Sequence, residues 1–403
     1  MNVEELVRDS LRELAEAQPG AAPGFAERVL RARRRRRARR LAALVSAGAA
    51  VVAVAVAAPL LPGGRGEPYP VAAGYGDSAH ADQSPPRELI AAGDTALAAY
   101  YRIRTVQVSE RQSVVQRTYW LLDPVSGRYE KDARWSVVAV APGLRTAAVL
   151  ERKLPASRIG LLDLRTREVE RWIPVDHAVG GLEFSNDATK LVATTYERHP
   201  DPYAPSDTDV EGGYVLPPPD PRRSGFHVLD VASGQGSWSA VADRDDDLGR
   251  QDFAFGRDGR TVYCQVIGAR DGLQQFYDLH GRPRAAPAGE RHLRSDVPAR
   301  LSPDGRLAAL GLSEELPPGR SYSSILDPRT GDEVAKVRGA QLLAWADDRR
   351  LIAWERVTGL DEPYRPRLVL VTIGSDETVP LSGVSEQGRY PFEDTWTPVF
   401  ARR

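Results

Sequence analysis

The sequence predicts an all-β domain preceded by a helical tail and one transmembrane helix. Three observations lead to this expectation: strand–turn units recur in tandem, residues 41–61 are apolar and uncharged, and a dense run of arginines precedes them. The 403 residues therefore divide into four parts. These are a basic amphipathic tail (1–40), a transmembrane helix (41–61), a flexible linker (62–94) and a large outer β domain (95–403).

A strand, a tight turn and a second strand recur along the outer domain. The clearest copy is LSPDGRLAAL at 301–310, and FGRDGRTVY at 255–263 is closely similar. In Pro-Asp-Gly, proline presets φ, the aspartate side chain bonds the backbone, and glycine accepts a positive φ. Each copy therefore predicts a β-hairpin. Weaker copies occur at 141–148, 184–192 and 346–353.

A second repeated element is an apolar strand that ends on an aspartate and a turn. The aspartates are Asp123, Asp163, Asp230, Asp278 and Asp327, so their spacings are 40, 67, 48 and 49 residues. The long interval contains an insertion. A period of this length indicates one four-stranded unit per repeat.

Together the two elements resemble the blades of TolB-like and WD40-like β-propellers. The Trp-Asp and Gly-His signatures of WD40 blades are missing, so the TolB-like family is the better comparison. The resemblance implies a six-bladed β-propeller, with seven blades as the alternative. Six blades require the strand near Trp396–Phe400 to pair beside Tyr100–Val108, because the C-terminal stretch has no partner of its own and the unit that begins at Tyr100 lacks its inner strand. This pairing closes the ring and removes exposed sheet edges.

Residues 41–61, LAALVSAGAAVVAVAVAAPLL, are long enough to cross a bilayer as a helix of roughly 30 Å. Arginines beside a membrane helix favour the cytoplasmic side. We therefore expect a single-pass protein of the cell membrane with a cytoplasmic N-terminus and an extracytoplasmic propeller. A cleaved signal peptide and a buried soluble helix are the alternatives. The flanking basic residues are Arg33, Arg34, Arg35, Arg36, Arg37, Arg39 and Arg40.

The tail carries eleven arginines and six acidic residues, a net charge of +5, whereas the rest of the chain is acidic. Residues 3–17 predict a short amphipathic helix. The order of acidic helix, arginine run, membrane span and outer domain resembles membrane-bound anti-sigma factors of high-GC, actinobacterial-type bacteria. Their zinc-binding His and paired Cys are absent here. The resemblance implies a cytoplasmic partner for the tail. Because a membrane span follows the arginines, we attribute their charge to the membrane and expect no nucleic-acid partner.

Long insertions fall on the propeller face that carries the loops between the second and third strands of each unit and the connections between blades. Residues 197–224 form the longest; because they are rich in proline, we expect a surface loop that can be shortened with little loss of stability. Variable loops on one face of a rigid scaffold are where binding usually occurs. The candidate binding residues are Asp201, Asp207, Asp209, Glu211, Asp243, Asp245, Asp246 and Asp247.

Motifs for catalysis or cofactor binding are missing from the sequence. Cys264 is the only cysteine, so no internal disulfide can form, and there is no His-Glu-x-x-His or Gly-x-Ser-x-Gly. The spacing of Asp243, Asp245 and Asp247 opens like a calcium loop, but Leu248 occupies the position that requires glycine. We therefore predict no catalytic residue, metal or cofactor. The expected function is binding or scaffolding of an envelope partner or ligand. The alternatives are an exported hydrolase or lyase with central carboxylates, and a transmembrane sensor or regulator.

Overall fold

The structure is a computed structural model of the chain, which divides into two compact units, Met1–Ala47 and Gly48–Arg403. The described residues all belong to the second unit and are 76–109, 112–203, 222–241, 250–266, 272–360, 364–385 and 395–403. The predicted tail, the predicted membrane helix and its flanking arginines lie outside them. Within the described ranges, no helix has the length and apolar character needed to cross a membrane.

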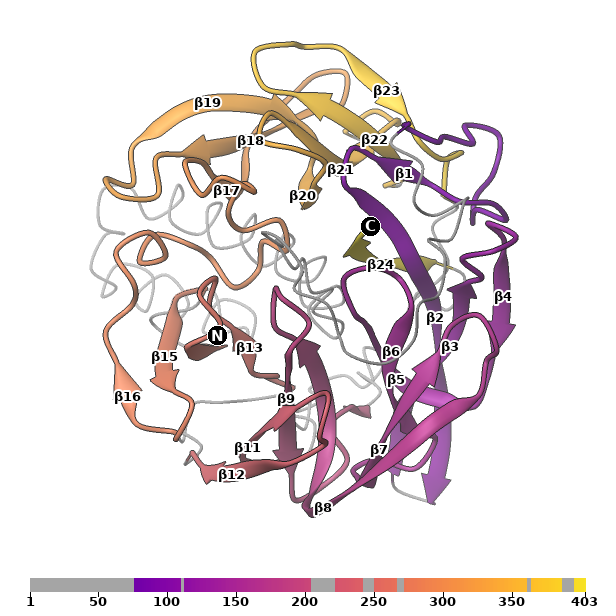
Figure 1. Ribbon diagram of the computed structural model, residues 1–403. Coiled ribbons are helices and arrows are strands. Elements are labelled where there is room, and N and C mark those ends of the chain that lie inside the picture. The colour runs from indigo at the N-terminus through magenta and orange to yellow at the C-terminus, as the bar shows by residue number, and fades with distance from the viewer. Residues whose placement is uncertain are drawn as a thin grey trace, which may run out of the picture. The chain divides into compact units, whose positions relative to one another are not determined.

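The described residues fold into 24 β-strands, arranged in five antiparallel sheets. Figure 1 shows the sheets following one another around a common centre, from indigo through magenta and orange to yellow. The all-β, propeller-like arrangement that the sequence predicts is confirmed. The first sheet contains β1 (Ala91–Ala92), β2 (Thr95–Ser109), β3 (Gln112–Leu122), β4 (Tyr129–Asp132), β10 (Pro202–Tyr203) and β24 (Trp396–Arg402).

The second sheet has seven strands because one of them, β8, is shared by two successive strand sets. Residues 169–174 of β8 pair with β7, and residues 179–184 pair with β9, with Val179 also opposite Ala156 of β7 across a register shift. The strand pairing thus gives five sheets rather than six separate blades. The strands are β5 (Trp135–Val140), β6 (Thr146–Glu151), β7 (Ala156–Asp163), β8 (Val169–Phe184), β9 (Lys190–Tyr196), β11 (Arg223–Asp230) and β12 (Gly236–Ala240).

The remaining three sheets are shorter and follow in chain order. The first contains β13 (Ala254–Phe255), β14 (Thr261–Gln265), β15 (Gln274–Asp278) and β16 (Pro283–Arg284). The next contains β17 (Ala308–Leu316), β18 (Arg320–Leu326) and β19 (Glu333–Arg338). The last contains β20 (Gln341–Trp345), β21 (Arg350–Arg356), β22 (Pro366–Thr372) and β23 (Thr378–Pro380).

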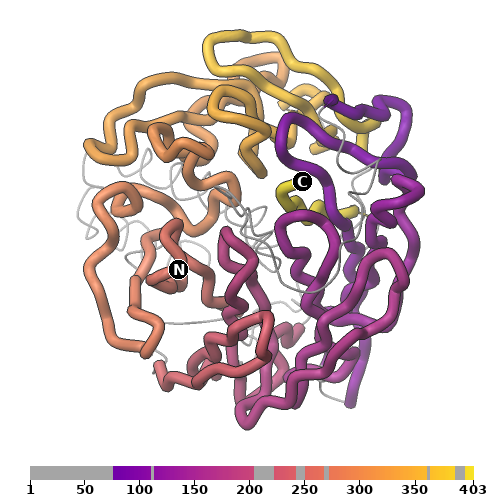
Figure 2. The backbone as a smooth tube through the Cα atoms, in the orientation of Figure 1, coloured from indigo at the N-terminus to yellow at the C-terminus, as the bar shows by residue number. Residues whose placement is uncertain are grey.

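Strand β24 closes the arrangement by pairing with β2, as the leftover strand in the sequence predicts. Tyr100 lies opposite Pro398, and Arg102 lies opposite Trp396. In Figure 2 the yellow C-terminal segment accordingly runs beside indigo backbone. Phe400 is almost fully buried in the largest apolar cluster, which also contains Leu343 of β20. The core therefore continues across the junction between the first and last sheets.

The β1–β2 turn packs against the last sheet closely enough to require glycine. Gly93 has φ +52°, and a Cβ atom there would lie 2.2 Å from the carbonyl oxygen of Ala346. The neighbouring Asp94 amide donates to that same oxygen at 2.9 Å. A side chain at Gly93 would therefore separate the two sheets at the point where the ring closes.

The Ser-Pro-Asp-Gly turn forms as its sequence predicts. The Ser302 hydroxyl donates to Asp304 Oδ1 at 2.7 Å, and the Arg306 amide donates to the same oxygen at 2.9 Å. Gly305 has φ +74°. The related turn at Ser185 and Asp187 repeats the hydroxyl–carboxylate bond at 2.6 Å. These local bonds fix the hairpins independently of the rest of the fold.

Two expectations from the sequence need correction. Residues 76–94, expected to be linker, belong to the folded unit: Ile90 is fully buried, and the His80 amide donates to the Leu381 carbonyl at 2.9 Å. The segment beginning at residue 197 is not entirely a surface loop either. Pro202 and Tyr203 pair with β3 as β10, because proline is accepted in a short strand at the edge of a sheet.

Candidate functional site

The sequence-predicted acidic residues separate into one buried side chain and seven outside the described residues. Asp201 is buried, immediately before β10. Asp207, Asp209, Glu211, Asp243, Asp245, Asp246 and Asp247 lie in the segments 204–221 and 242–249, which are outside the described ranges. Asp201 is therefore not an exposed binding residue, as the sequence suggested, because its carboxylate is enclosed by two arginines.

Arg117 of β3 and Arg250 hold the Asp201 carboxylate between them. Arg117 Nη1 and Nη2 donate to the two oxygens at 2.7 and 2.9 Å, which is a bidentate pair. Arg250 Nη1 donates to Oδ2 at 2.7 Å. All three side chains are less than a tenth exposed. This charge cluster, Arg117–Asp201–Arg250, joins three segments that are far apart in sequence.

Burial and charge oppose each other at Asp201. Burial by itself would raise the pKa of its carboxyl, but the attraction of Arg117 and Arg250 is larger. The pKa is lowered to about 2, so the carboxylate stays ionised at any physiological pH. The same pairing raises the pKa of Arg250 despite the burial of its guanidinium. The cluster is therefore fully charged in the folded protein.

Further hydrogen bonds connect the charge cluster to the inner strands. Arg250 Nε donates to Asp252 at 2.8 Å, and Arg250 Nη2 donates to the Gly180 carbonyl at 2.5 Å. The Tyr196 hydroxyl donates to Asp252 at 2.9 Å and accepts from the Gln251 amide at 3.1 Å. Because these bonds satisfy most of the buried polar atoms, the charge cluster is held rigidly in place.

Glu183 of β8 is the buried acid that best fits the expectation of central carboxylates. Burial raises the pKa of its carboxyl to about 8, although the positive charge of Arg300 opposes that shift. One carboxyl oxygen accepts from the Phe255 amide at 3.3 Å. A carboxyl with this pKa is largely protonated at neutral pH. Because it is only 8% exposed, the group is enclosed by protein and serves packing between β8 and β13.

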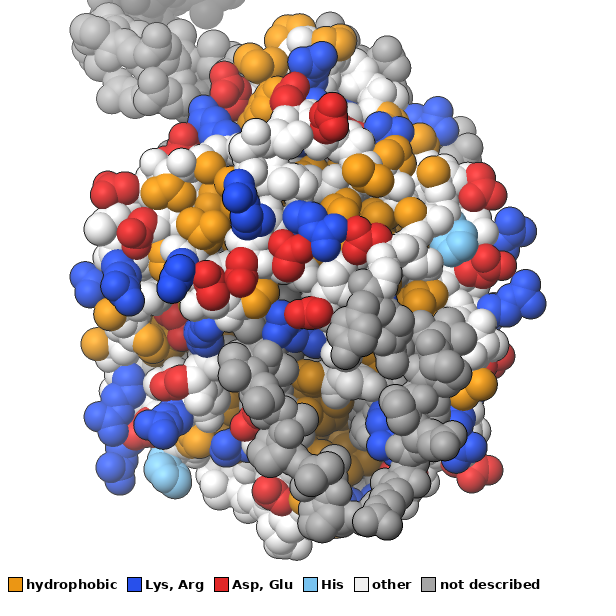
Figure 3. Space-filling view, turned by 45° about the horizontal axis from the view of Figure 1, so that its top comes forward, with side chains coloured by type: hydrophobic (Ala, Val, Ile, Leu, Met, Phe, Trp, Pro, Cys, Tyr) orange, Lys and Arg blue, Asp and Glu red, His pale blue; other side chains and the backbone are white. Residues whose placement is uncertain are grey.

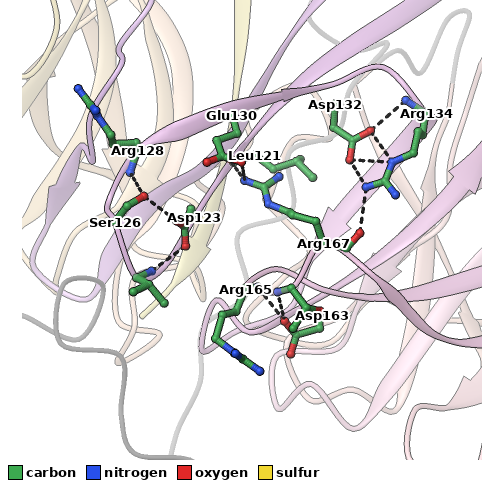
Figure 4. A network of polar contacts seen from close by, with 12 residues as sticks. Leu121, Asp123, Ser126, Arg128, Glu130, Asp132, Arg134, Asp163, Arg165 and Arg167 are labelled. Carbon is green, nitrogen blue, oxygen red and sulfur yellow. Dashed lines mark hydrogen bonds and ion pairs between the residues drawn. The ribbon is translucent and has the colours of Figure 1, made fainter.

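A second polar network joins the first two sheets and is structural. In Figure 4, Arg134 donates to Asp132 at 2.6 Å and to the carbonyl oxygen of Arg167 at 3.0 Å. Arg167 in turn donates to the Leu121 carbonyl at 2.7 Å. These bonds run from the turn between β7 and β8 to strands β3 and β4. They hold neighbouring strand sets together.

One group of possible metal ligands is present that the sequence did not suggest. Asp176 and His177 of β8 and His227 of β11 place one ligand atom each within 4.8 Å of one another. His177 and His227 are 50 residues apart and belong to no motif, so only the folded strands bring them together. On the face of the molecule shown in Figure 3, basic and acidic side chains lie interspersed among one another.

Comparison with known proteins gives only distant likenesses. No family model matches the chain, and no curated protein matches its sequence. Among solved structures, the chain is similar to hydrazine synthase of Kuenenia stuttgartiensis, with 13% identity over 58% of this chain and 62% of that one and a TM-score of 0.33. It is also similar to TolB from Acinetobacter baumannii, with 14% identity over 71% and 66% of the two chains and a TM-score of 0.34. The chain spans less than two thirds of each.

Proposed function

We propose that the protein is a membrane-anchored binding or scaffolding module, whose extracytoplasmic propeller recognises a positively charged envelope partner or ligand. The charge cluster carries this proposal. Asp201 and Arg250, bonded at 2.7 Å, lie close in sequence to the acidic segments 204–221 and 242–249. The first segment has four acidic residues and no basic one, and the second has four acidic residues and one arginine.

The charge cluster Arg117–Asp201–Arg250 keeps the residues that flank the two acidic segments near each other. Glu197 and Arg222, which flank the first segment, are themselves paired at 3.6 Å. Two segments of the same charge sign whose described flanking residues lie close together favour a negative local potential, which attracts cationic surfaces and raises their association rate. This is why the proposed partner is basic rather than apolar. Enzymatic activity is not part of the proposal.

We further propose six blades for the propeller. The division of β8 supports this count, because splitting the seven-stranded sheet between residues 174 and 179 leaves four strands on each side. The three-stranded set of β17, β18 and β19 gains Leu301 at its inner edge, because Leu301 forms a bridge to Ala308 of β17. The β24–β2–β3–β4 set is then the blade that both ends of the folded unit complete.

Anchoring by residues 41–61 completes the proposal. The apolar length and the arginine run support a cytoplasmic N-terminus. A reporter that is active only outside the cytoplasm, fused after Arg403, should be active. Activity of a cytoplasm-only reporter at the same position would refute the orientation.

The binding proposal is tested with the full chain in lipid nanodiscs and an arginine-rich peptide as probe, by fluorescence anisotropy. Neutralising Asp207, Asp209, Glu211 and Asp220 to their amides should weaken binding at least tenfold, and the difference should shrink as salt rises. The matched control neutralises four exposed acids elsewhere, Glu168, Glu170, Asp332 and Glu377. Equal weakening by both variants, or by neither, would overturn the assignment of the partner to the acidic segments.

A further inference from the structure

Strand β8 contains a short stretch that pairs with neither neighbour. Its pairing with β7 is interrupted after Pro174 and resumes only at Val179, opposite Ala156, and its pairing with β9 also begins at Val179. Asp176 and His177 lie in this stretch, where the strand passes from one set to the next. Their backbone position is thus set by the pairing on both sides, while their side chains are free of ladder constraints.

His227 of β11 faces this stretch from the neighbouring strand set. Its Nε2 atom lies 3.3 Å from the His177 carbonyl oxygen and 3.6 Å from Asp176 Oδ1. The His177 Nδ1 atom lies 3.1 Å from the same carboxylate oxygen. Three side chains of two types, imidazole and carboxylate, therefore converge on one point.

Packing fixes both imidazoles. His177 stacks flat on Trp238 of β12, with the ring centroids 3.6 Å apart and the planes at 2°. Trp238 is itself held by its indole nitrogen, which donates to Thr195 Oγ1 at 3.1 Å. The His227 side chain is only 5% exposed. Stacking and burial therefore restrict the orientation of the two rings.

The His177 Nδ1 atom is buried and makes no hydrogen bond within the described residues. The Asp176 carboxylate oxygen Oδ1 lies 3.1 Å from this nitrogen, at ion-pair distance. Buried polar atoms normally have a partner. A cation bound between this nitrogen and the carboxylate would supply one. The Asp176 side chain is 75% exposed, so it can turn toward such an ion at little cost.

We propose that Asp176, His177 and His227 form a binding site for a divalent transition-metal ion of the zinc class. Two imidazole nitrogens and one carboxylate oxygen are donors that zinc prefers over calcium or magnesium. The Asp176 Oδ1 atom lies 3.1 Å from His177 Nδ1 and 3.6 Å from His227 Nε2, and the three residues offer ligand atoms within 4.8 Å of one another, close to the spread that one ion with zinc bond lengths of roughly 2.0–2.2 Å bridges.

Coordination replaces contacts that the metal-free site makes. The His227 Nε2 atom gives up its approach to the His177 carbonyl and presents its lone pair to the ion, while its Nδ1 carries the proton. The ion then links β8 to β11 at the place where β8 lacks a paired neighbour. Three protein ligands leave a fourth position for water or for a donor from a partner.

The test uses the full chain in detergent micelles, without a polyhistidine tag, and Zn²⁺ as the probe in competition with a chromophoric chelator. Millimolar Mg²⁺ in the buffer occupies other acidic surfaces. We expect one Zn²⁺ per chain, and at least tenfold weaker affinity in Asp176→Asn and in His177→Gln. The matched control is His280→Gln, an exposed histidine of the β15–β16 turn, which should bind as the wild type does.

Two further measurements keep the result interpretable. The melting temperature without metal reports whether each variant still folds, and Asp176→Asn should be unaffected because the side chain is exposed. Co²⁺ in place of Zn²⁺ should give the visible absorption of a four-coordinate nitrogen–oxygen site in the wild type only. Wild-type affinity in both ligand variants, or no stoichiometric Zn²⁺ in the wild type, would overturn the proposal.

Discussion

Replacing Asp201 by asparagine should destabilise the folded unit strongly. The substitution keeps the shape of the side chain but removes the negative charge between Arg117 and Arg250. The two buried guanidinium groups then face a neutral amide. Breaking a buried ion pair by removing one partner costs about 3–5 kcal/mol, because the remaining charge is desolvated without compensation.

The pKa of Asp201 gives an independent measure of the same effect. A shift from the ordinary value of 3.8 to about 2 corresponds to a stabilisation of about 2–3 kcal/mol. Because the folded-state pKa is depressed, this contribution is present above pH 3.8 and is lost as the pH falls toward 2. The stability difference between the wild type and Asp201→Asn should therefore narrow below pH 4.

Thermal unfolding followed by tryptophan fluorescence measures the change, since all seven tryptophans lie among the described residues. For a unit of roughly 330 residues, 3–5 kcal/mol corresponds to a fall in melting temperature of about 4–7 °C. The control Asp94→Asn, at a 62% exposed side chain 3.8 Å from Arg402, should change the stability by less than about 1 kcal/mol. If Asp201→Asn melted within 1 °C of the wild type, the charge cluster would not support the fold.

Two further predictions concern the closing strand and the buried acid. Phe400→Ala should lower the stability by about 3–5 kcal/mol, measured by chemical denaturation, because the ring is 1% exposed within the largest core cluster; a loss below 1 kcal/mol would show that β24 is not part of the core. Glu183→Gln should stabilise the protein at pH 8 but hardly at pH 4.5. The raised pKa of Glu183 means that wild-type stability declines as the pH rises from 4.5 through about 8, and a neutral amide avoids that decline; parallel pH profiles of the two proteins would contradict this assignment.

Local turn chemistry explains why the strand units could be predicted from the sequence. The bonds from Ser302 and Arg306 to Asp304 span at most a few residues, so the short sequence motif includes every residue that forms the turn. The pairing of β24 with β2 was predictable for a different reason. The C-terminal strand had no partner of its own and the unit containing β2 lacked an inner strand, and a propeller leaves few positions for such a strand.

The long strand β8 shows where the unit-by-unit interpretation was insufficient. The sequence indicates the end of one strand set and the start of the next, but it does not show that the backbone stays extended between them. Ile173 pairs with Ile159 of β7, and Val179 pairs with Thr195 of β9. Continuity of the backbone through this junction merges two sets into one sheet of seven strands.

Asp201 was misjudged because its partners are distant in sequence. Arg117 is 84 residues away and Arg250 is 49 residues away, and no spacing rule connects them. In a proline-rich acidic stretch, an aspartate is normally solvated. The signal that could have separated it from its neighbours is the following Pro-Tyr pair, which forms β10 and places the carboxylate against β3.

Ring closure depends on contacts from both ends of the folded unit. The Gly143 amide donates to the Arg402 carbonyl at 2.8 Å, and the Arg403 amide donates to the Asp94 carbonyl at 2.9 Å. Residues 396–402 thus contact the first sheet on one side and the β5–β6 turn on the other. The first sheet lacks its inner strand until that segment is in place. Hairpins such as Ser302–Leu307 do not depend on this step, because their bonds are local. Ring closure must follow them, because non-local pairing carries the larger loop-closure entropy.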